Sequence, residues 1–411
     1  MGLKTAFFDW LGASEQKTSR TAPLMIQFGS AGSPRFTPRQ YDRLAEEGYQ
    51  KNVVVYRCVR LITQNAASVP WTLSQGKGHH KIKLHEHPLL SLLTRPNPMQ
   101  GGTELLESLF GFFLIAGNGY LEVVGPKGSE PAELWSLRPD RIRIVPGKGG
   151  VPSAYRYTAG GQNLDFEVDP MTGRAQVLHI KSFHPLDDWY GMSPLEAAAF
   201  SIDQHNAAGI WNAALLQQSG RPSGALVYKP SSGSSDHLTA EQRQALKTEL
   251  ETFFSGTINA GRPLVLEGGL DWKEMALSPK DMDWLAGKDM SAREIALAFN
   301  VPAQLIGLEG SLTFANFEQA RLALYDDAVL PLLTHIRDEL NNWLCPQFGD
   351  NLQLDFNIDS IDAFSTRREK RWERISQANF LTVNEKRDAF GYDRLEGGDF
   401  LTGNGEEALK S

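Results

Sequence analysis

The feature that most constrains the fold of this chain is a long segment almost without charge, residues 193–220, SPLEAAAFSIDQHNAAGIWNAALLQQSG. Only Glu196 and Asp203 carry a formal charge in it, and alanines recur throughout. Ser193 suits a helix N-cap, and Pro194 suits the first helical turn. The segment therefore predicts one long helix, and a helix with so few charges is expected to be covered on most sides.

A second long helix is expected at 279–300, where Ser278 and Pro279 open the segment and Pro302 follows its end. Between the two helices, residues 220–278 read as strand, helix and strand. Such an insertion would stand away from the main body on a two-helix stalk. Because the uncharged helix needs partners beyond its single mate, the pattern favours neighbouring subunits in a ring; burial inside a monomer is the alternative.

The rest of the chain indicates a mixed α+β protein. Its 411 residues, 41% hydrophobic and 22% charged, suffice for a folded core and for two to four structural units at roughly 100–200 residues each. Residues 1–52 read as a partly disordered lead-in with one short helix, and strand formers cluster across 120–181. Apolar residues at every fourth position predict a long helix over 316–344, bent at Pro331. Residues 363–390 are helical and charged.

Charge and cysteine content exclude several classes of protein. The net charge of −8 disfavours a sequence-specific DNA-binding protein. The basic run RREKRWER at 367–374 would have its charges interleaved on a helix, which favours a solvated face over a phosphate clamp. Cys58 and Cys345 are too few for a disulfide framework or a Cys-ligated zinc site and read as core thiols. The apolar run at 109–117 is too short to cross a membrane, and without a secretory signal the chain is expected to be cytosolic.

Residues 301–319, VPAQLIGLEGSLTFANFEQ, form an unusual junction between two helical segments. The middle, GLEGSLT, combines two glycines and two leucines with one acid and two hydroxyls, and it lacks the Lys of a phosphate-cradling loop. We expect a flexible loop there. A connector that simply packs on the body is the alternative.

The search for catalytic chemistry yields one cluster, in GHHKIKLHEHP at 78–88. Its members are His79, His80, His85 and His87, with Glu86 as a further oxygen ligand. A cytosolic metal-dependent hydrolase built on residues 79–87 is the alternative function that this cluster suggests. A polar turn between two strands is favoured, because no HExxH helix or second carboxylate motif accompanies it. No nucleophile elbow, Walker A loop, dinucleotide fingerprint or kinase motif is present. We therefore predict no catalytic residue, no metal and no cofactor, and expect that the protein is not an enzyme.

Nine short segments, in order over about 53–400, carry a family resemblance. They are YRCVRLITQNAASVPWTL (56–73), HPLLSLLTRPNP (87–98), GNGYLEV (117–123), LWSLRPDRIRI (134–144), GMSPLEAA (191–198), GRPSGAL (220–226), NAGRPLVLEGGLDWKEMALSP (259–279), REIALAFNVPAQLIG (293–307) and LTVNEKRDAFG (381–391). Together they resemble the portal, or head-to-tail connector, family of tailed bacteriophages, siphophage type. The chain departs from the family pattern at 301–303, where many relatives have Val-Pro-Pro. Its compact length would also suit a prophage or a gene transfer agent.

The resemblance implies a ring, usually a dodecamer, at one vertex of an icosahedral head. Terminase would package double-stranded DNA through the ring, and DNA would leave by the same conduit. The implied partners are further copies of the chain, double-stranded DNA without sequence specificity, the terminase large subunit, the head–tail adaptor and the major capsid protein, with no membrane. The implied location is the portal vertex of the virion, with assembly in the host cytoplasm. A homo-oligomeric scaffold without a channel is a further alternative.

The resemblance also implies a division of the chain. The α/β wing would comprise 53–192 and 302–362, the two-helix stem 193–219 and 279–301, the small α/β clip 220–278 and the helical crown 363–411. The DNA-facing tunnel loop would fall at 305–316, with Gly307, Leu308, Glu309, Gly310, Ser311, Leu312 and Thr313 as its site residues. Leu308 and Leu312 would pack against neighbouring loops or touch the duplex, and Ser311 and Thr313 would meet phosphates. Lys280 and Lys288 are the candidate DNA contacts of the stem.

Overall fold

The structure is a computed structural model that describes residues 40–76, 81–126, 128–147, 150–217, 224–228, 270–274, 284–308, 313–390, 392 and 394–401, with short pieces between 239 and 248. Its helices include α2 (Tyr41–Arg43), η1 (Leu44–Gln50), α3 (Val53–Ala67), α4 (Pro88–Thr94), α5 (Gly102–Ala116), α6 (Pro194–Gln217), α8 (Trp284–Ala298), η5 (Ala303–Ile306), α9 (Phe314–Leu324), η6 (Tyr325–Val329), α10 (Leu330–Trp343), α11 (Ser365–Gln377) and α12 (Val383–Ala389). Its strands are β1 (Trp71–Gln75), β2 (Ile82–Leu84), β3 (Asn118–Val124), β4 (Glu133–Leu137), β5 (Ile142–Pro146), β6 (Pro152–Ala159), β7 (Gln162–Glu167), β8 (Val177–Lys181), β9 (Gly224–Tyr228), β10 (Leu270–Glu274) and β11 (Leu352–Phe356).

The strands form small antiparallel sheets, in the orders β11-β1-β2, β4-β3-β8, β5-β6-β7 and β10-β9. Six of the strands, β3 to β8, lie within the region 118–181, so the strand-rich unit expected there is confirmed. The first sheet joins distant parts of the chain, because Trp71 in β1 pairs with Phe356 in β11. Segments on either side of α6 and α8 therefore share one body.

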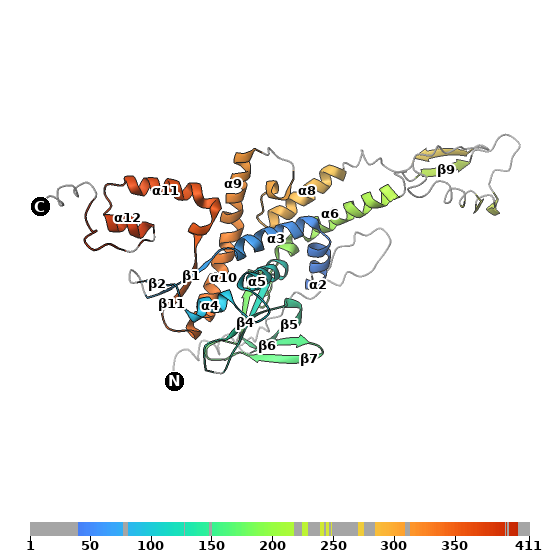
Figure 1. Ribbon diagram of the computed structural model, residues 1–411. Coiled ribbons are helices and arrows are strands. Elements are labelled where there is room, and N and C mark those ends of the chain that lie inside the picture. Colours follow the sequence, from blue (N-terminus) through green and yellow to red (C-terminus); the bar gives the residue numbers. More distant parts are fainter. Residues whose placement is uncertain are drawn as a thin grey trace, which may run out of the picture.

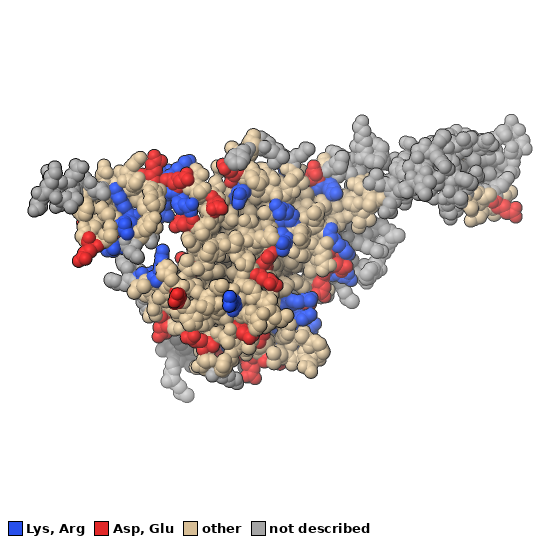
Figure 2. Space-filling view, in the orientation of Figure 1, with Lys and Arg blue, Asp and Glu red and all other residues tan. Residues whose placement is uncertain are grey.

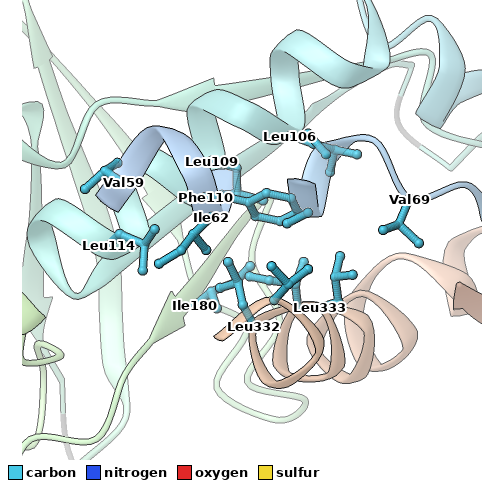
Figure 3. Packing of buried hydrophobic residues seen from close by; sticks show 14 of the residues in the cluster. Val59, Ile62, Val69, Leu106, Leu109, Phe110, Leu114, Ile180, Leu332 and Leu333 are labelled. Atoms are coloured by element: carbon cyan, nitrogen blue, oxygen red, sulfur yellow. The ribbon is translucent and has the colours of Figure 1, made fainter. Parts of the chain in front are cut away.

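The main core lies between α3, α5 and α10. Val59 and Ile62 of α3, Leu109 and Phe110 of α5, and Leu333 of α10 are almost completely buried and point toward one another (Figure 3). The apolar residues of these helices recur every three or four positions, which places them on the faces that meet.

Both cysteines lie in this core as free thiols. Burial raises the pKa of the Cys58 thiol to about 12 and also raises the pKa of Cys345. A thiol held in its protonated form behaves as a small apolar side chain, which confirms the interpretation made from the sequence.

The residues just before α3 are part of the body rather than a detached lead-in. Leu44 belongs to the main core, and Gly48 lies so close to α6 that a Cβ there would come within 2.9 Å of Leu195 Cδ2. The Asn52 side chain caps α3 by accepting hydrogen bonds from the backbone N–H groups of Val54 and Val55. The expected short helix over 41–50 is present, as α2 and η1.

The long helix expected over 316–344 is present but changes geometry in its middle. A π-helical segment, η6, joins α9 to α10 immediately before Pro331. Proline has no N–H, so residue 331 cannot donate to the Asp327 carbonyl four residues earlier. That carbonyl instead accepts a hydrogen bond from the Asn300 side chain, at 3.3 Å. The bend predicted at Pro331 is thus a local π distortion stabilised from another helix.

Helices α6 and α8 run side by side out of the body, and β9 lies beyond the far end of α6 (Figure 1). Helices α11 and α12 lie at the opposite end of the molecule (Figure 1). Among the residues that the structure describes, no helix is both long enough and apolar enough to cross a membrane.

Candidate functional site

The start of α6 is fixed by the residues that the sequence indicated. Pro194 occupies the first turn, and Ser193 Oγ accepts a hydrogen bond from Leu195 N at 3.0 Å. The Ser193 N–H in turn donates to Glu196 Oε1 at 3.4 Å, which completes a reciprocal cap. Ser193 Oγ also donates to the Leu114 carbonyl at 2.9 Å, so the cap anchors α6 to α5.

Small side chains and polar contacts hold the two long helices together. Ser201 Oγ of α6 donates to Glu294 Oε2 of α8 at 2.6 Å, and Ser291 Oγ of α8 donates to Gln204 Oε1 at 3.2 Å. Buried residues of the pair include Ala198, Ile202, Ala208, Ala292, Ile295 and Ala296. The interface between α6 and α8 therefore combines apolar packing with hydrogen bonds, and the hydrogen bonds fix the register of the two helices.

A buried histidine links this pair to the body. His205 Nδ1 lies 3.2 Å from Asn52 Nδ2, and the same amide nitrogen donates to Asn206 Oδ1 at 2.9 Å. Burial lowers the pKa of His205, and the positive charge of Lys288 lowers it further. Lys288, one of the two predicted stem contacts, is half-buried on α8 and within electrostatic range of His205. The other, Lys280, lies outside the described residues.

The outer faces of both helices expose large apolar side chains. Phe200 and Ile210 of α6 are 57% and 71% exposed, and Met290 and Leu297 of α8 are 59% and 74% exposed. On α6 the exposed residues Phe200, Ala207 and Ile210 recur at helical spacing and form one stripe, and Gln204 lies at its edge, where it bonds to Ser291 of α8. The covering that the sequence predicted for α6 is thus incomplete within one chain. The low number of charges in α6 indicated that the helix would be covered, but the sequence did not reveal which side of the helix stays exposed in one chain.

Helix α8 ends as expected before Pro302, through a specific backbone turn. Asn300 adopts a left-handed conformation with φ 53°. Val301 N donates to the Ala296 carbonyl at 2.9 Å, and Asn300 N donates to the Leu297 carbonyl at 3.0 Å. This pair of bonds is the Schellman motif, in which asparagine can replace glycine at the left-handed position.

The junction after α8 is partly fixed to the body. Leu305 is buried, and Gly307 has a φ of 81°, which favours glycine. Leu308 is half-buried, and its side chain packs against the main core of the same copy. Thr313 Oγ1 accepts a hydrogen bond from Asn316 N at 3.3 Å and caps α9. The four remaining predicted loop residues lie outside the described residues: Glu309, Gly310, Ser311 and Leu312.

One member of the histidine cluster, His87, has a structural role. His87 Nδ1 accepts a hydrogen bond from Leu89 N at 3.2 Å, so His87 is the N-cap of α4. His85 and Glu86 are exposed, whereas His79 and His80 lie outside the described residues. Within the described part of the chain, no group of three or more His, Cys, Asp or Glu residues is placed to hold a metal ion. The hydrolase alternative gains no support from this geometry.

Comparison with known sequences agrees with the family resemblance. The family described as phage portal protein matches residues 53–391. A protein of Rickettsia bellii (strain RML369-C) is 42% identical over 359 residues, which cover 87% of this chain and 91% of that protein. The portal protein of Enterobacteria phage HK97 is 25% identical over 358 residues, covering 84% of this chain and 80% of the phage protein.

Solved structures share the fold. A chain in the neck of a native gene transfer agent particle, computed with C12 symmetry, is 44% identical with a TM-score of 0.66, over 89% of this chain and 97% of that chain. An HK97 family phage portal protein from Corynebacterium diphtheriae is 17% identical with a TM-score of 0.55, over 79% and 96% of the two chains. Because the family match covers most of the chain and the fold extends over the same region, this protein belongs to the phage portal protein family.

Proposed function

We propose that this chain assembles into the ring-shaped channel at one capsid vertex through which double-stranded DNA is packaged and later released. The observation that carries the proposal is the 44% identity, over 89% of this chain, to a chain found in a particle neck with C12 symmetry. Twelve copies around one axis are accordingly the proposed assembly. The channel binds and guides DNA without chemistry of its own, and the proposed partners are terminase, the head–tail adaptor and the major capsid protein. Assembly would take place in the host cytoplasm.

The regions of the chain take their proposed roles from the arrangement in Figure 1. Helices α6 and α8 are the stem, and the segment between them, with the β9–β10 pair, is the clip. The body is the wing, since the pairing of β1 with β11 joins 53–192 to 302–362. Helices α11 and α12 belong to the crown.

The exposed stripe of α6 is the proposed contact between copies. Large apolar side chains in water are unfavourable, and a neighbouring copy removes them from water without any change in this chain's own fold. In a closed ring each copy uses two different surfaces, one for each neighbour. The stripe centred on Phe200 and Ile210 would face α8 of the next copy, where Met290 and Leu297 are exposed.

The proposed DNA-facing loop runs from Gly307 to Thr313. Leu308 packs on the core and Thr313 caps α9, so they serve as its two fixed ends, and the contact with DNA falls to residues 309–312. Lys280 and Lys288 are proposed phosphate contacts of the stem. Contacts of this kind position a duplex without reading its sequence.

Light scattering and negative-stain imaging of the purified chain test the ring. We expect rings with a mass about twelve times that of the 45.6 kDa chain. Ile210→Asp places a charge in the proposed contact and should shift most of the protein to monomers. The matched control is Ile82→Asp, at a 69% exposed isoleucine on β2. A wild-type chain that stays monomeric under all conditions contradicts the function, and intact Ile210→Asp rings contradict the contact.

Replacement of residues 309–312 by Gly-Ser-Gly-Ser tests the loop and leaves both fixed ends in place. We expect normal rings and a several-fold fall in nuclease-protected DNA inside the particles. A deletion of 308–313 is less informative, because it also removes the Leu308 packing and the Thr313 cap. Rings that fail to assemble would make the loop structural, and full DNA content would make it a simple connector.

A further inference from the structure

Helix α11 carries a group of cations that have no carboxylate partner among the described residues. Lys370, Arg371 and Arg374 are exposed, and no carboxylate of the described residues lies within ion-pair distance of them. Arg367, on the same helix, is different, because its guanidinium pairs with Asp326 at 2.8 Å. Blue side chains are visible at the end of the molecule where α11 and α12 lie (Figure 2).

Helical geometry gathers these charges on one side of α11. At 3.6 residues per turn, four of the five cations fall within an arc of about 100°, namely Arg367, Lys370, Arg371 and Arg374, and Arg368 lies about 60° beyond its edge. The midpoint between the acids Glu369 and Glu373 lies about 130° from the centre of that arc. The interleaving expected from the sequence is therefore wrong, because residues that are adjacent in the run point in different directions on the helix.

Other faces of α11 are used for packing, and they hold the basic face outward. The Trp372 ring stacks on Phe390 with 4.3 Å between ring centroids. The Arg368 guanidinium donates to the Asp359 carbonyl, and Lys386 Nζ of α12 donates to the Ser376 carbonyl at 2.9 Å. The helix is thus held by its neighbours on sides that leave the three cations free.

Repulsion between these cations destabilises α11 while no anionic partner is bound. Like charges three or four residues apart on a helix repel by a few tenths of a kcal/mol per pair. An anionic partner relieves this repulsion and gains the charge-assisted hydrogen bonds that Lys and Arg form with phosphate.

We infer that the α11 basic face, defined as Lys370, Arg371 and Arg374, binds the phosphate backbone of double-stranded DNA. Lys370 and Arg374 lie about 6 Å apart along the helix axis, and phosphates follow one another by about 3.4 Å along each strand, so the face spans about two phosphates. The inference rests on the proposed DNA-conducting function. It adds a site that retains DNA in the crown, apart from the loop and stem contacts.

The test compares the triple variant Lys370→Gln/Arg371→Gln/Arg374→Gln with the control variant Lys81→Gln/Lys83→Gln/Arg95→Gln, which removes three exposed cations from the body. Binding of a fluorescent 30-base-pair duplex is measured by anisotropy from 50 to 200 mM NaCl. We expect the α11 variant to bind more weakly at 50 mM. The slope of log affinity against log salt should be shallower by about 1.8 for each helix that contacts two phosphates, which is about 12-fold across this range. The control should match the wild type.

Ring assembly of the same proteins, measured by light scattering, separates this inference from the proposed function. Normal rings with unchanged duplex affinity and slope in the α11 variant would overturn the α11 site and leave the function intact. A variant that loses its rings but keeps its affinity for the duplex would make the face a contact between copies, which also overturns the inference. Failure of the wild-type chain to form rings would count against the function itself.

Discussion

Helices α5 and α6 are both rich in apolar residues, but the fold covers the large apolar side chains of α5 more completely than those of α6. In α5, Leu109 and Phe110 are fully buried between α3 and α10 (Figure 3). In α6, Phe200 and Ile210 are more than half exposed, although the helix carries only two formal charges. The first helix stabilises a single copy of the chain, and the second exposes apolar surface that, in the ring we propose, a neighbouring copy covers. Low charge in a helix thus indicates burial, without indicating whether that burial occurs within one copy or between copies.

The largest effect expected from this comparison is on the stability of one copy. Phe110→Ala removes a fully buried ring and should lower the free energy of unfolding by about 3–5 kcal/mol. Ile210→Ala, at a 71% exposed position, should change it by less than about 0.5 kcal/mol. Urea unfolding at a concentration where the chain is monomeric measures both. Equal losses in the two variants would show that α6 is covered within one copy and would remove the difference between the helices.

A smaller effect is expected from two histidines, His179 in β8 of the body and His205 in α6. His179 in β8 stacks on Tyr120 at 4.5 Å and bonds through Nε2 to Asn118 Oδ1 at 2.9 Å. Burial lowers its pKa to about 3, with a further contribution from Lys181. The unfolded chain takes up this proton near pH 6.5, so the contribution of His179 to stability is present above 6.5 and is lost as pH falls toward 3.

We therefore expect acidification from pH 6.5 to 5 to cost the wild type about 1–2 kcal/mol more than it costs His179→Gln. This expected cost is smaller than the cost calculated from the whole pKa shift, because the His179 side chain keeps some exposure to solvent. The pKa of His205, which lies between α6 and the body, is also lowered. His205→Gln should therefore also make the free energy of unfolding less dependent on pH. Urea unfolding of the three proteins at both pH values gives the result. Parallel pH profiles for wild type and His179→Gln would contradict the assignment of this histidine.

The sequence predicted the features that depend on neighbouring residues. Ser193 and Pro194 start α6, Pro302 follows the end of α8, and the bend near Pro331 is present as a π segment. These follow from capping and from the missing proline N–H, which act within one turn of a helix. The family was also predictable, because nine motifs in order identify it without any knowledge of contacts.

Tertiary structure decided the rest. The pairing of β1 with β11, the packing of Leu308 on the core and the open side of α6 all depend on which distant segments meet. The basic face of α11 follows from helical periodicity, but the stacking of Trp372 on Phe390 that turns this face outward depends on the tertiary structure. Local patterns determine where a helix begins and ends, because capping and backbone bonding involve residues a few positions apart. The side of each helix that stays exposed depends on contacts between residues hundreds of positions apart, and only the folded chain brings these together.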